Sequence, residues 1–294
     1  YGSHREMLEK EQLDVVSVCT PNYAHKEGTI DSLKAGCHVL CEKPLAVTAK
    51  DVREMFAEAK KRRKVLMTAQ HFRFTSEARI AHEFVKAGEL GDVYFGKVFA
   101  IRRWGIPGWG VFHIKDKSGG GALIDIGVHQ LDLTLWLMGS PEPVTVSGMT
   151  YAKVGKRKDL SVRYGWNWDR NEFDVDDYAA GFVRFKNGAC LTIECSWAGN
   201  IKQDRFETHI VGTEGGASLG PLQIHKVMHG ALVDVTPINL PGLKPHHEEI
   251  RHFLNVLLGK EELIVKPHET LRVIQILEGL YRSSLAGKEI KVNY

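Results

Sequence analysis

Two short apolar runs near the start of the chain limit its fold more than any other feature. Residues 13–19 and 37–40 have the composition of buried strands, and residues 25–35 between them have the pattern of a helix. Because parallel strands need a crossover of this kind, the segment predicts a βαβ unit. Helix and apolar strand continue to alternate to about residue 98, so we expect this part of the chain to form an α/β domain.

Both strands are followed by polar turns that contain proline. Thr20-Pro21-Asn22 follows the first strand, with His25 three residues later, and Glu42-Lys43-Pro44 follows the second. Proline favours extended geometry in the residue before it, which constrains Lys43. In open α/β sheets the carboxyl ends of the strands form the ligand-binding edge. A lysine beside a turn is more often a solvated surface charge, so this motif alone leaves both interpretations open.

The segment from Gly119 to Gly139 is predicted to be an apolar helix with polar residues on one face. Asp125, His129 and Asp132 are four and then three residues apart, which is the spacing of neighbours on a helix surface. Buried polar groups without a partner cost roughly 2–7 kcal/mol each. A pocket that holds a polar substrate would satisfy them, and so would hydrogen bonds to neighbouring backbone. The spacing is compatible with both.

From residue 93 onwards, consecutive strands replace the alternation of helix and strand. Four segments have the strand pattern, at residues 144–151, 178–185, 189–198 and 206–212. Asn187-Gly188 is a typical hairpin turn between two of them. Two helices, near residues 247–258 and 268–285, follow the strands. Strands without intervening helices favour an antiparallel sheet, so we expect this half to be α+β.

Composition argues against several classes of protein. The 294 residues include 39 basic and 36 acidic side chains, a balance that gives no support for a nucleic-acid partner or an anionic membrane surface. The longest apolar stretches are far shorter than the ~20 residues of a membrane span, and no signal peptide is visible. The five cysteines are scattered and odd in number, which favours reduced thiols in a cytoplasmic protein.

Histidines and acids are grouped once, at His246-His247-Glu248-Glu249 with His252. This group follows a proline and begins an amphipathic helix, so a solvated helix start is the favoured interpretation and we predict no metal site. The sequence also lacks the HExxH and GxSxG motifs, which gives no support for metal-dependent or serine-dependent hydrolysis.

Tryptophans are concentrated in two predicted loops. Trp104 and Trp109 flank a Gly-Ile-Pro-Gly turn, and Trp166 and Trp168 precede another strand. Indole rings stack on the C–H faces of sugars, but loop tryptophans also act as packing anchors or subunit contacts. We predict substrate contacts for Trp104, Trp109 and Trp166. Of two consecutive arginines on the preceding strand only one can point inward, and we select Arg102.

The proline turns and the spaced Asp/His helix, in this order, resemble the glucose–fructose oxidoreductase/inositol dehydrogenase (Gfo/Idh/MocA) family. The similarity covers nearly the whole chain and includes Arg73-Phe74, the glycine turn at 212–216 and the closing helix around 281–287. It implies the C-terminal portion of a Rossmann-type dinucleotide-binding domain in residues 1–98. A substrate-binding and oligomerisation domain with a large, mostly antiparallel open sheet would follow in residues 99–294, with a final helix that can pack back on the first domain.

The resemblance also implies a function. The protein would transfer a hydride between NAD or NADP and a secondary alcohol or ketone of a sugar, glycoside or cyclic polyol. His129 would take the hydroxyl proton, Lys43 would stabilise charge on the substrate oxygen, and Asp125 would orient substrate or imidazole. These three would also bind substrate, whereas Asp132 can be structural. The residues expected to contact the cofactor are Thr20, Pro21, Asn22, His25, Glu42, Lys43 and Arg73.

One part of the family pattern is absent from this sequence. Family members begin with a strand and a Gly-x-Gly-x-x-Gly/Ala turn that binds the pyrophosphate, whereas Gly105, Gly108 and Gly110 have the wrong spacing. The absent portion would need about 60 residues, at roughly 30 per βαβ unit. We expect that the intact protein carries this turn and binds NAD(H) or NADP(H), and that a polypeptide starting at Tyr1 binds neither appreciably.

Two other functions stay open at this stage. The same site can support a redox-neutral reaction, in which transient oxidation enables elimination of a glycosidic bond. The chain can also be a sensor that binds nucleotide or sugar without turnover.

The predicted sheet has a second face that no helix of the sequence is expected to cover. Apolar and polar residues alternate over 191–196, so this second face contains polar side chains. We therefore expect a homodimer or homotetramer.

Overall fold

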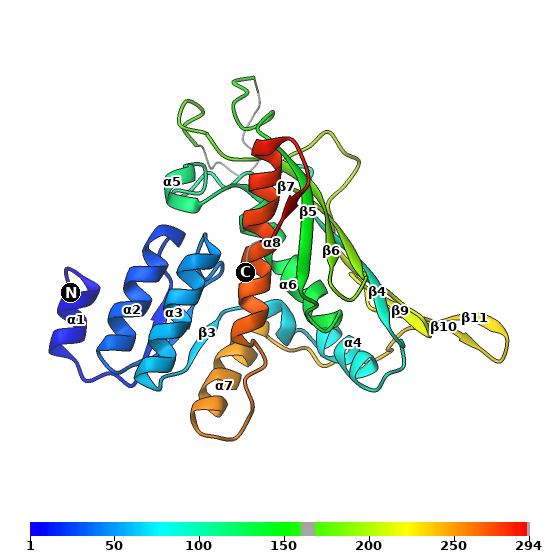
Figure 1. Ribbon diagram of the computed structural model, residues 1–294, viewed down its shortest axis with the longest axis horizontal. Coiled ribbons are helices and arrows are strands. Elements are labelled where there is room, and N and C mark those ends of the chain that lie inside the picture. Colours follow the sequence, from blue (N-terminus) through cyan, green and yellow to red (C-terminus); the bar gives the residue numbers. More distant parts are fainter. Residues whose placement is uncertain (160–167, 293–294) are drawn as a thin grey trace.

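Two sheets of different kinds, joined by helices, make up the computed structural model, which describes residues 1–159 and 168–292 (Figure 1). In the described part of the chain the first sheet contains three parallel strands, β1 (Val15–Val18), β2 (His38–Cys41) and β3 (Leu66–Thr68), in that order. Helices α2 (His25–Lys34) and α3 (Ala49–Arg62) are the crossovers. The predicted βαβ unit is confirmed.

Local sequence explains these elements. The strand residues of β2 and β3 are almost all buried, as expected for parallel strands. Helix α3 begins where Thr48 accepts a hydrogen bond from the Asp51 backbone N–H, and it ends with basic residues that suit the helix dipole. The other elements of this half are α1 (His4–Lys10), η1 (Asn22–Ala24), η2 (His71–Phe74) and α4 (Ser76–Lys86).

The second sheet is open and has nine strands in the described residues, in the order β11-β10-β9-β8-β4-β7-β6-β5-β12. Neighbouring strands are antiparallel except for the parallel pair β4 and β7. The strands are β4 (Val93–Ile101), β5 (Pro143–Tyr151), β6 (Tyr178–Phe185), β7 (Cys190–Ser196), β8 (Arg205–Gly212), β9 (Gly215–Leu219), β10 (Gln223–Met228), β11 (Ala231–Val235) and β12 (Ile290–Lys291). The predicted, mostly antiparallel open sheet is confirmed.

The domain boundary predicted at residue 98 falls inside β4. This strand pairs with β7 and β8 along its length, so all of it belongs to the large sheet. The chain therefore leaves the first sheet earlier, between β3 and β4. The sequence pattern does not show where the chain passes from one sheet to the other, because a strand that follows a helix has the same pattern in either sheet.

Helix α8 (Pro267–Ala286) lies between the two halves, next to α3, α6 (Val128–Leu137) and β5 (Figure 1). Glu278 on α8 accepts a hydrogen bond from the backbone N–H of Ala49, at 2.8 Å. On the large sheet, a Cβ at Gly181 would lie 2.5 Å from the Leu280 side chain, so glycine permits this close approach. Helix α8 therefore contacts elements of both halves.

Helix α7 (Pro245–Leu257) precedes α8 and packs on η2, and α5 (Lys115–Ser118) lies near η1. Within residues 1–159 and 168–292, no helix combines the length and the apolar character that crossing a membrane requires.

Arg73 links three elements through buried ion pairs. Its side chain is fully buried, and its Nε and Nη2 donate to the two carboxylate oxygens of Asp132 on α6, at 2.7 and 2.6 Å. Its Nη1 donates to Glu269 on α8, at 2.5 Å, and to the carbonyl oxygen of Ile264. Our prediction that Arg73 contacts the cofactor is therefore wrong, because its guanidinium is enclosed and engaged by these acceptors.

Replacing Arg73 by alanine would leave the carboxylates of Asp132 and Glu269 buried without a cation. We expect Arg73→Ala to lower the free energy of unfolding by about 3–5 kcal/mol. Urea denaturation followed by circular dichroism measures this. Arg62→Ala, which removes an exposed pair with Glu58, is the control and should leave the midpoint nearly unchanged. An equal, small effect of both variants would contradict the structural role of Arg73.

Candidate active site

Three consecutive glycines position the start of the central helix. The Asp176 carboxylate accepts hydrogen bonds from the backbone N–H groups of Gly121 and Leu123, at 2.7 and 2.9 Å, and from the Tyr281 hydroxyl, at 2.8 Å. A Cβ at Gly121 would lie 1.8 Å from the backbone oxygen of Asp176, so only glycine fits there. This buried carboxylate satisfies the free donors of the helix start and fixes its position.

The helix does not begin as an α-helix. Its first five residues, η3 (Leu123–Gly127), form a π-helical turn, and α6 continues from Val128. Such turns are rare and occur frequently at functional sites. Asp125 and His129 line a cavity, whereas Asp132 is fully buried and paired with Arg73. Our prediction of one shared polar face is therefore wrong for Asp132, which has the structural role that we left open.

Lys43 reaches Asp125 from the end of β2. Its Nζ donates to the Asp125 backbone oxygen at 2.8 Å and to the carboxylate oxygen Oδ1 at 3.0 Å. The other carboxylate oxygen accepts a hydrogen bond from the indole Nε1 of Trp197, at 2.9 Å. Both side chains are mostly buried, with 15% and 13% exposed. Asp125 therefore orients Lys43, and not the imidazole that we had named as a possible partner.

His129 is enclosed by other rings. Phe72 stacks on it with ring centroids 5.0 Å apart, and His71 meets it edge-on at 4.9 Å. Its Nδ1 is buried and has no hydrogen-bond partner among the described residues. Burial, together with the positive charge of Lys43, lowers the pKa of His129 well below 6.5. The imidazole is therefore neutral at physiological pH and able to accept a proton.

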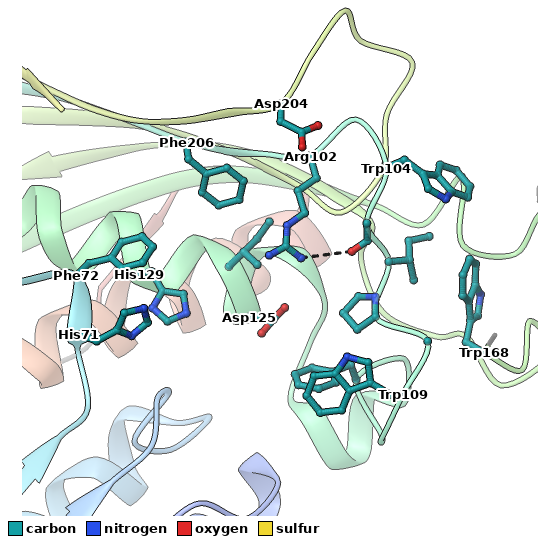
Figure 2. A pocket seen from close by; sticks show the side chains of 16 residues that line it. His71, Phe72, Arg102, Trp104, Trp109, Asp125, His129, Trp168, Asp204 and Phe206 are labelled. Atoms are coloured by element: carbon teal, nitrogen blue, oxygen red, sulfur yellow. Dashed lines mark hydrogen bonds between the residues drawn. The ribbon is translucent and has the colours of Figure 1, made fainter. Parts of the chain in front are cut away.

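Two cavities meet at these residues. The first, which we call the aromatic cavity, has a volume of about 630 Å³ and contains His129 (Figure 2). The second, the strand-end cavity, has about 490 Å³ and is lined by Lys43 and the ends of β1 and β2. Asp125, Trp109 and Phe112 line both. Lys43 therefore belongs to one cavity and His129 to the other, and Asp125 borders both.

Residues 1–70 match the family described as "Oxidoreductase family, NAD-binding Rossmann fold", and residues 78–218 match the "GFO/IDH/MocA C-terminal domain". The chain is 37% identical over 280 residues to a D-glucoside 3-dehydrogenase of Escherichia coli, an alignment that covers 95% of this chain and 79% of that one. This chain belongs to the Gfo/Idh/MocA oxidoreductase family. The predicted family, enzyme class and nicotinamide cofactor are confirmed at this level.

Other relatives and solved structures agree with this family assignment. A levoglucosan dehydrogenase of Pseudarthrobacter phenanthrenivorans is 28% identical over 72% of this chain and 56% of its own length. The structure of a levoglucosan dehydrogenase in complex with NADH and levoglucosan matches with a TM-score of 0.85 and 23% identity, covering 100% of this chain and 84% of that one. The structural match shows that the two proteins share the Gfo/Idh/MocA fold.

Most of the residues predicted from the family resemblance line one of the two cavities. Thr20, Pro21, Asn22, Glu42 and Lys43 line the strand-end cavity. Arg102, Trp104 and Trp109 line the aromatic cavity, where the Arg102 guanidinium points inward as predicted (Figure 2). Trp168 also lines this cavity, and its indole donates to the backbone oxygen of Gly155 at 2.7 Å. Trp166 lies outside the described residues.

His25 lines the strand-end cavity and also links the two proline turns. Its side chain is fully buried, and its two ring nitrogens lie 2.7 and 2.8 Å from the backbone oxygens of Thr20 and Pro44. Because both nitrogens are engaged by the protein, His25 ties the two proline turns together. It positions the wall of the strand-end cavity, which it also lines, and its contact with the cofactor stays a prediction.

The sequence analysis missed the group behind His129. His246 at the start of α7 stacks on His71 with ring centroids 4.1 Å apart, and Glu249 and His252 are each 2% exposed. The predicted solvated helix start is therefore wrong for Glu249 and His252. The spacing of three residues between these side chains was a usable signal, because it places all of them on the helix face that packs against η2.

Glu249 has an unusual environment for a carboxyl group. Its Oε1 has no hydrogen-bond partner among the described residues. Burial and the nearby Glu42 carboxylate raise the pKa of Glu249 to about 8. The folded protein therefore holds a proton on Glu249 at neutral pH, where the unfolded chain releases it.

This shift predicts a pH-dependent stability. Between about pH 4.5 and pH 8 the folded state binds more protons than the unfolded chain, so stability falls as the pH rises through this range. We expect Glu249→Gln to remove that slope and to raise the free energy of unfolding by about 1–3 kcal/mol at pH 8. Denaturant unfolding at pH 5 to 8 measures it, with the exposed Glu262→Gln as control. An unchanged slope in Glu249→Gln would contradict the buried, protonated carboxyl.

Proposed function

We propose that this protein oxidises a secondary hydroxyl of a sugar or glycoside, or reduces the corresponding ketone, with a nicotinamide cofactor. The proposal rests on one observation: Lys43, in the strand-end cavity, is hydrogen-bonded to Asp125, which also lines the aromatic cavity that contains His129. The names of the relatives support the substrate class: a D-glucoside 3-dehydrogenase, a levoglucosan dehydrogenase and a 1,5-anhydro-D-fructose reductase.

The strand-end cavity fits the nicotinamide end of the cofactor. It lies at the carboxyl ends of two parallel strands, which is where dinucleotides bind in such sheets. Its wall combines the apolar surfaces of Pro21 and Phe112 with the polar groups of Thr20 and Lys43. The bound cofactor supplies the hydride acceptor or donor. The residues that line this cavity do not include a Gly-x-Gly-x-x-Gly turn, so they fit the nicotinamide and not the pyrophosphate.

Residues of this chain can take up the proton of the substrate hydroxyl and stabilise the charge on its oxygen. In the oxidation direction, His129 accepts the hydroxyl proton, which its lowered pKa allows at neutral pH. Lys43 donates a hydrogen bond to the same oxygen and stabilises the negative charge that develops on it. Asp125 and Trp197 hold Lys43 in place for this task.

The aromatic cavity fits the remainder of a sugar. Trp104 and Trp109 present ring surfaces on which sugar C–H faces can stack, and Trp109 also borders the strand-end cavity. Arg102 extends from the end of β4 into the cavity, where its guanidinium supplies donors for substrate hydroxyls (Figure 2). A polar ring with several hydroxyls matches this combination of aromatic surface and cationic donors.

Removal of either Lys43 or His129 tests this function. In the cofactor-binding enzyme, we expect Lys43→Ala and His129→Ala each to lower kcat by roughly 10²–10⁴ without unfolding. Substrate-dependent NADH formation, followed by absorbance with a panel of glycosides and polyols, measures this. The exposed Lys50→Ala is the control. Near-wild-type rates in both variants would refute the assignment, and product formation without net NADH would favour the redox-neutral reaction instead.

We also propose that the uncovered face of the large sheet joins two copies of the chain. Helices α6 and α8 cover one face, where Leu191, Ile193 and Cys195 of β7 are buried (Figure 1). On the other face Thr192 and Glu194 are partly exposed. A mixed, open face of this kind suits a self-complementary interface.

The oligomeric state tests this proposal directly. We expect multi-angle light scattering to report a dimer or a dimer of dimers at micromolar concentration. Thr192→Arg, which places a charge in the middle of the face, should shift the protein towards monomer. A wild-type monomer at that concentration would contradict the interface.

We further propose a cytoplasmic location. The five cysteines, none of which forms a disulfide, support it.

A further inference from the structure

The proposed oxidation leaves a proton on His129 that must depart before the next turnover. Asp125 is hydrogen-bonded to Lys43 and Trp197, and among the described residues it makes no hydrogen bond to the imidazole. The Nδ1 of His129 is buried and without a partner among the described residues. The base therefore needs another neighbour that can take up a proton.

Two further imidazoles connect His129 to the protein surface. The ring of His71, on η2, meets His129 edge-on, with 4.9 Å between centroids and 69° between planes. His71 lies beside His129 on the side away from Trp104 and Trp168 (Figure 2). Behind it, the ring of His246 lies 4.1 Å from that of His71, and His246 is exposed on the first turn of α7. The three rings form a continuous row from the cavity to solvent.

We propose that His71 and His246 carry the proton from His129 to solvent. The inference rests on the proposed dehydrogenase function. An imidazole can accept a proton at one ring nitrogen and release one from the other, directly or through one water. The substrate O–H bond breaks and its proton passes to His129, then to His71, then to His246, and finally to water or buffer. Each ring gains one proton and loses one, so none is consumed.

The charged groups around the three imidazole rings favour movement of the proton towards solvent. Burial is the main cause of the lowered pKa of His129. Lys43 and Arg102, which follow β2 and β4, and the two neighbouring imidazoles lower it further. Burial, His246 and Lys43 lower the pKa of His71 to about 4. Neither inner ring therefore retains the proton, whereas exposed His246 can exchange it with solvent.

Phenylalanine variants in the cofactor-binding, full-length enzyme test the relay, because the ring stays and the nitrogens are lost. We expect His71→Phe and His246→Phe in weak buffer to lower the steady-state rate at least roughly tenfold, less than the 10²–10⁴ expected for the base itself. The first turnover of NADH formation, measured by stopped flow, should stay near the wild-type rate. Added imidazole should restore steady-state turnover. His247→Phe, the exposed neighbour of His246, is the matched control and should behave as wild type.

A measurement that needs no turnover tests whether the charge of one imidazole ring affects the pKa of the next. In histidine NMR titrations of the protein without cofactor, His246→Phe should raise the pKa of His71, because it removes a cationic neighbour. Wild-type steady-state rates in both relay variants, or a slowed first turnover that imidazole does not restore, would overturn the relay and leave the dehydrogenase function standing. A wild-type enzyme that forms no NADH with any sugar would overturn both.

Discussion

The contact between Lys43 and Asp125 is the interaction on which the site depends. Lys43 belongs to the small parallel sheet, and Asp125 belongs to the helix that packs on the large sheet. Their contact therefore holds the strand-end cavity and the aromatic cavity next to each other. The hydrogen bonds of His25 on one side, and the Asp176 carboxylate at the helix start on the other, fix the two backbones that carry this pair.

Polar groups along the central helix divide into two kinds. Asp132 and its partner Arg73 face inward and engage each other and neighbouring acceptors, which is what burial of charge requires. His129 instead has a buried nitrogen without a partner, and Glu249 behind η2 has a buried oxygen without one. Because His129 also lines the aromatic cavity, it is placed to exchange a proton with a ligand.

The sequence predicted the parts of the site that depend on local pattern. Strand ends with proline turns identified Lys43, and helical spacing identified Asp125 and His129. The ion pair of Arg73 with Asp132 was not predictable, because its partners are 59 residues apart and only folding brings them together. The π-helical turn has the same residue composition as an α-helix, so no pattern distinguishes the two. Glu249 and His252 were misread because an amphipathic helix is also consistent with a solvated surface, and only the packing of α7 on η2 shows that they are buried.

A double-mutant cycle on Lys43 and Asp125 tests the central claim most directly. The measured quantity is the rate of the first hydride transfer to the cofactor in the full-length enzyme, for Lys43→Met, Asp125→Asn and the pair together. If Asp125 acts through Lys43, the double variant should be no slower than Lys43→Met alone, with a coupling energy of about 1–3 kcal/mol. Additive losses from the two substitutions would show that Asp125 and Lys43 act independently, and would contradict the account.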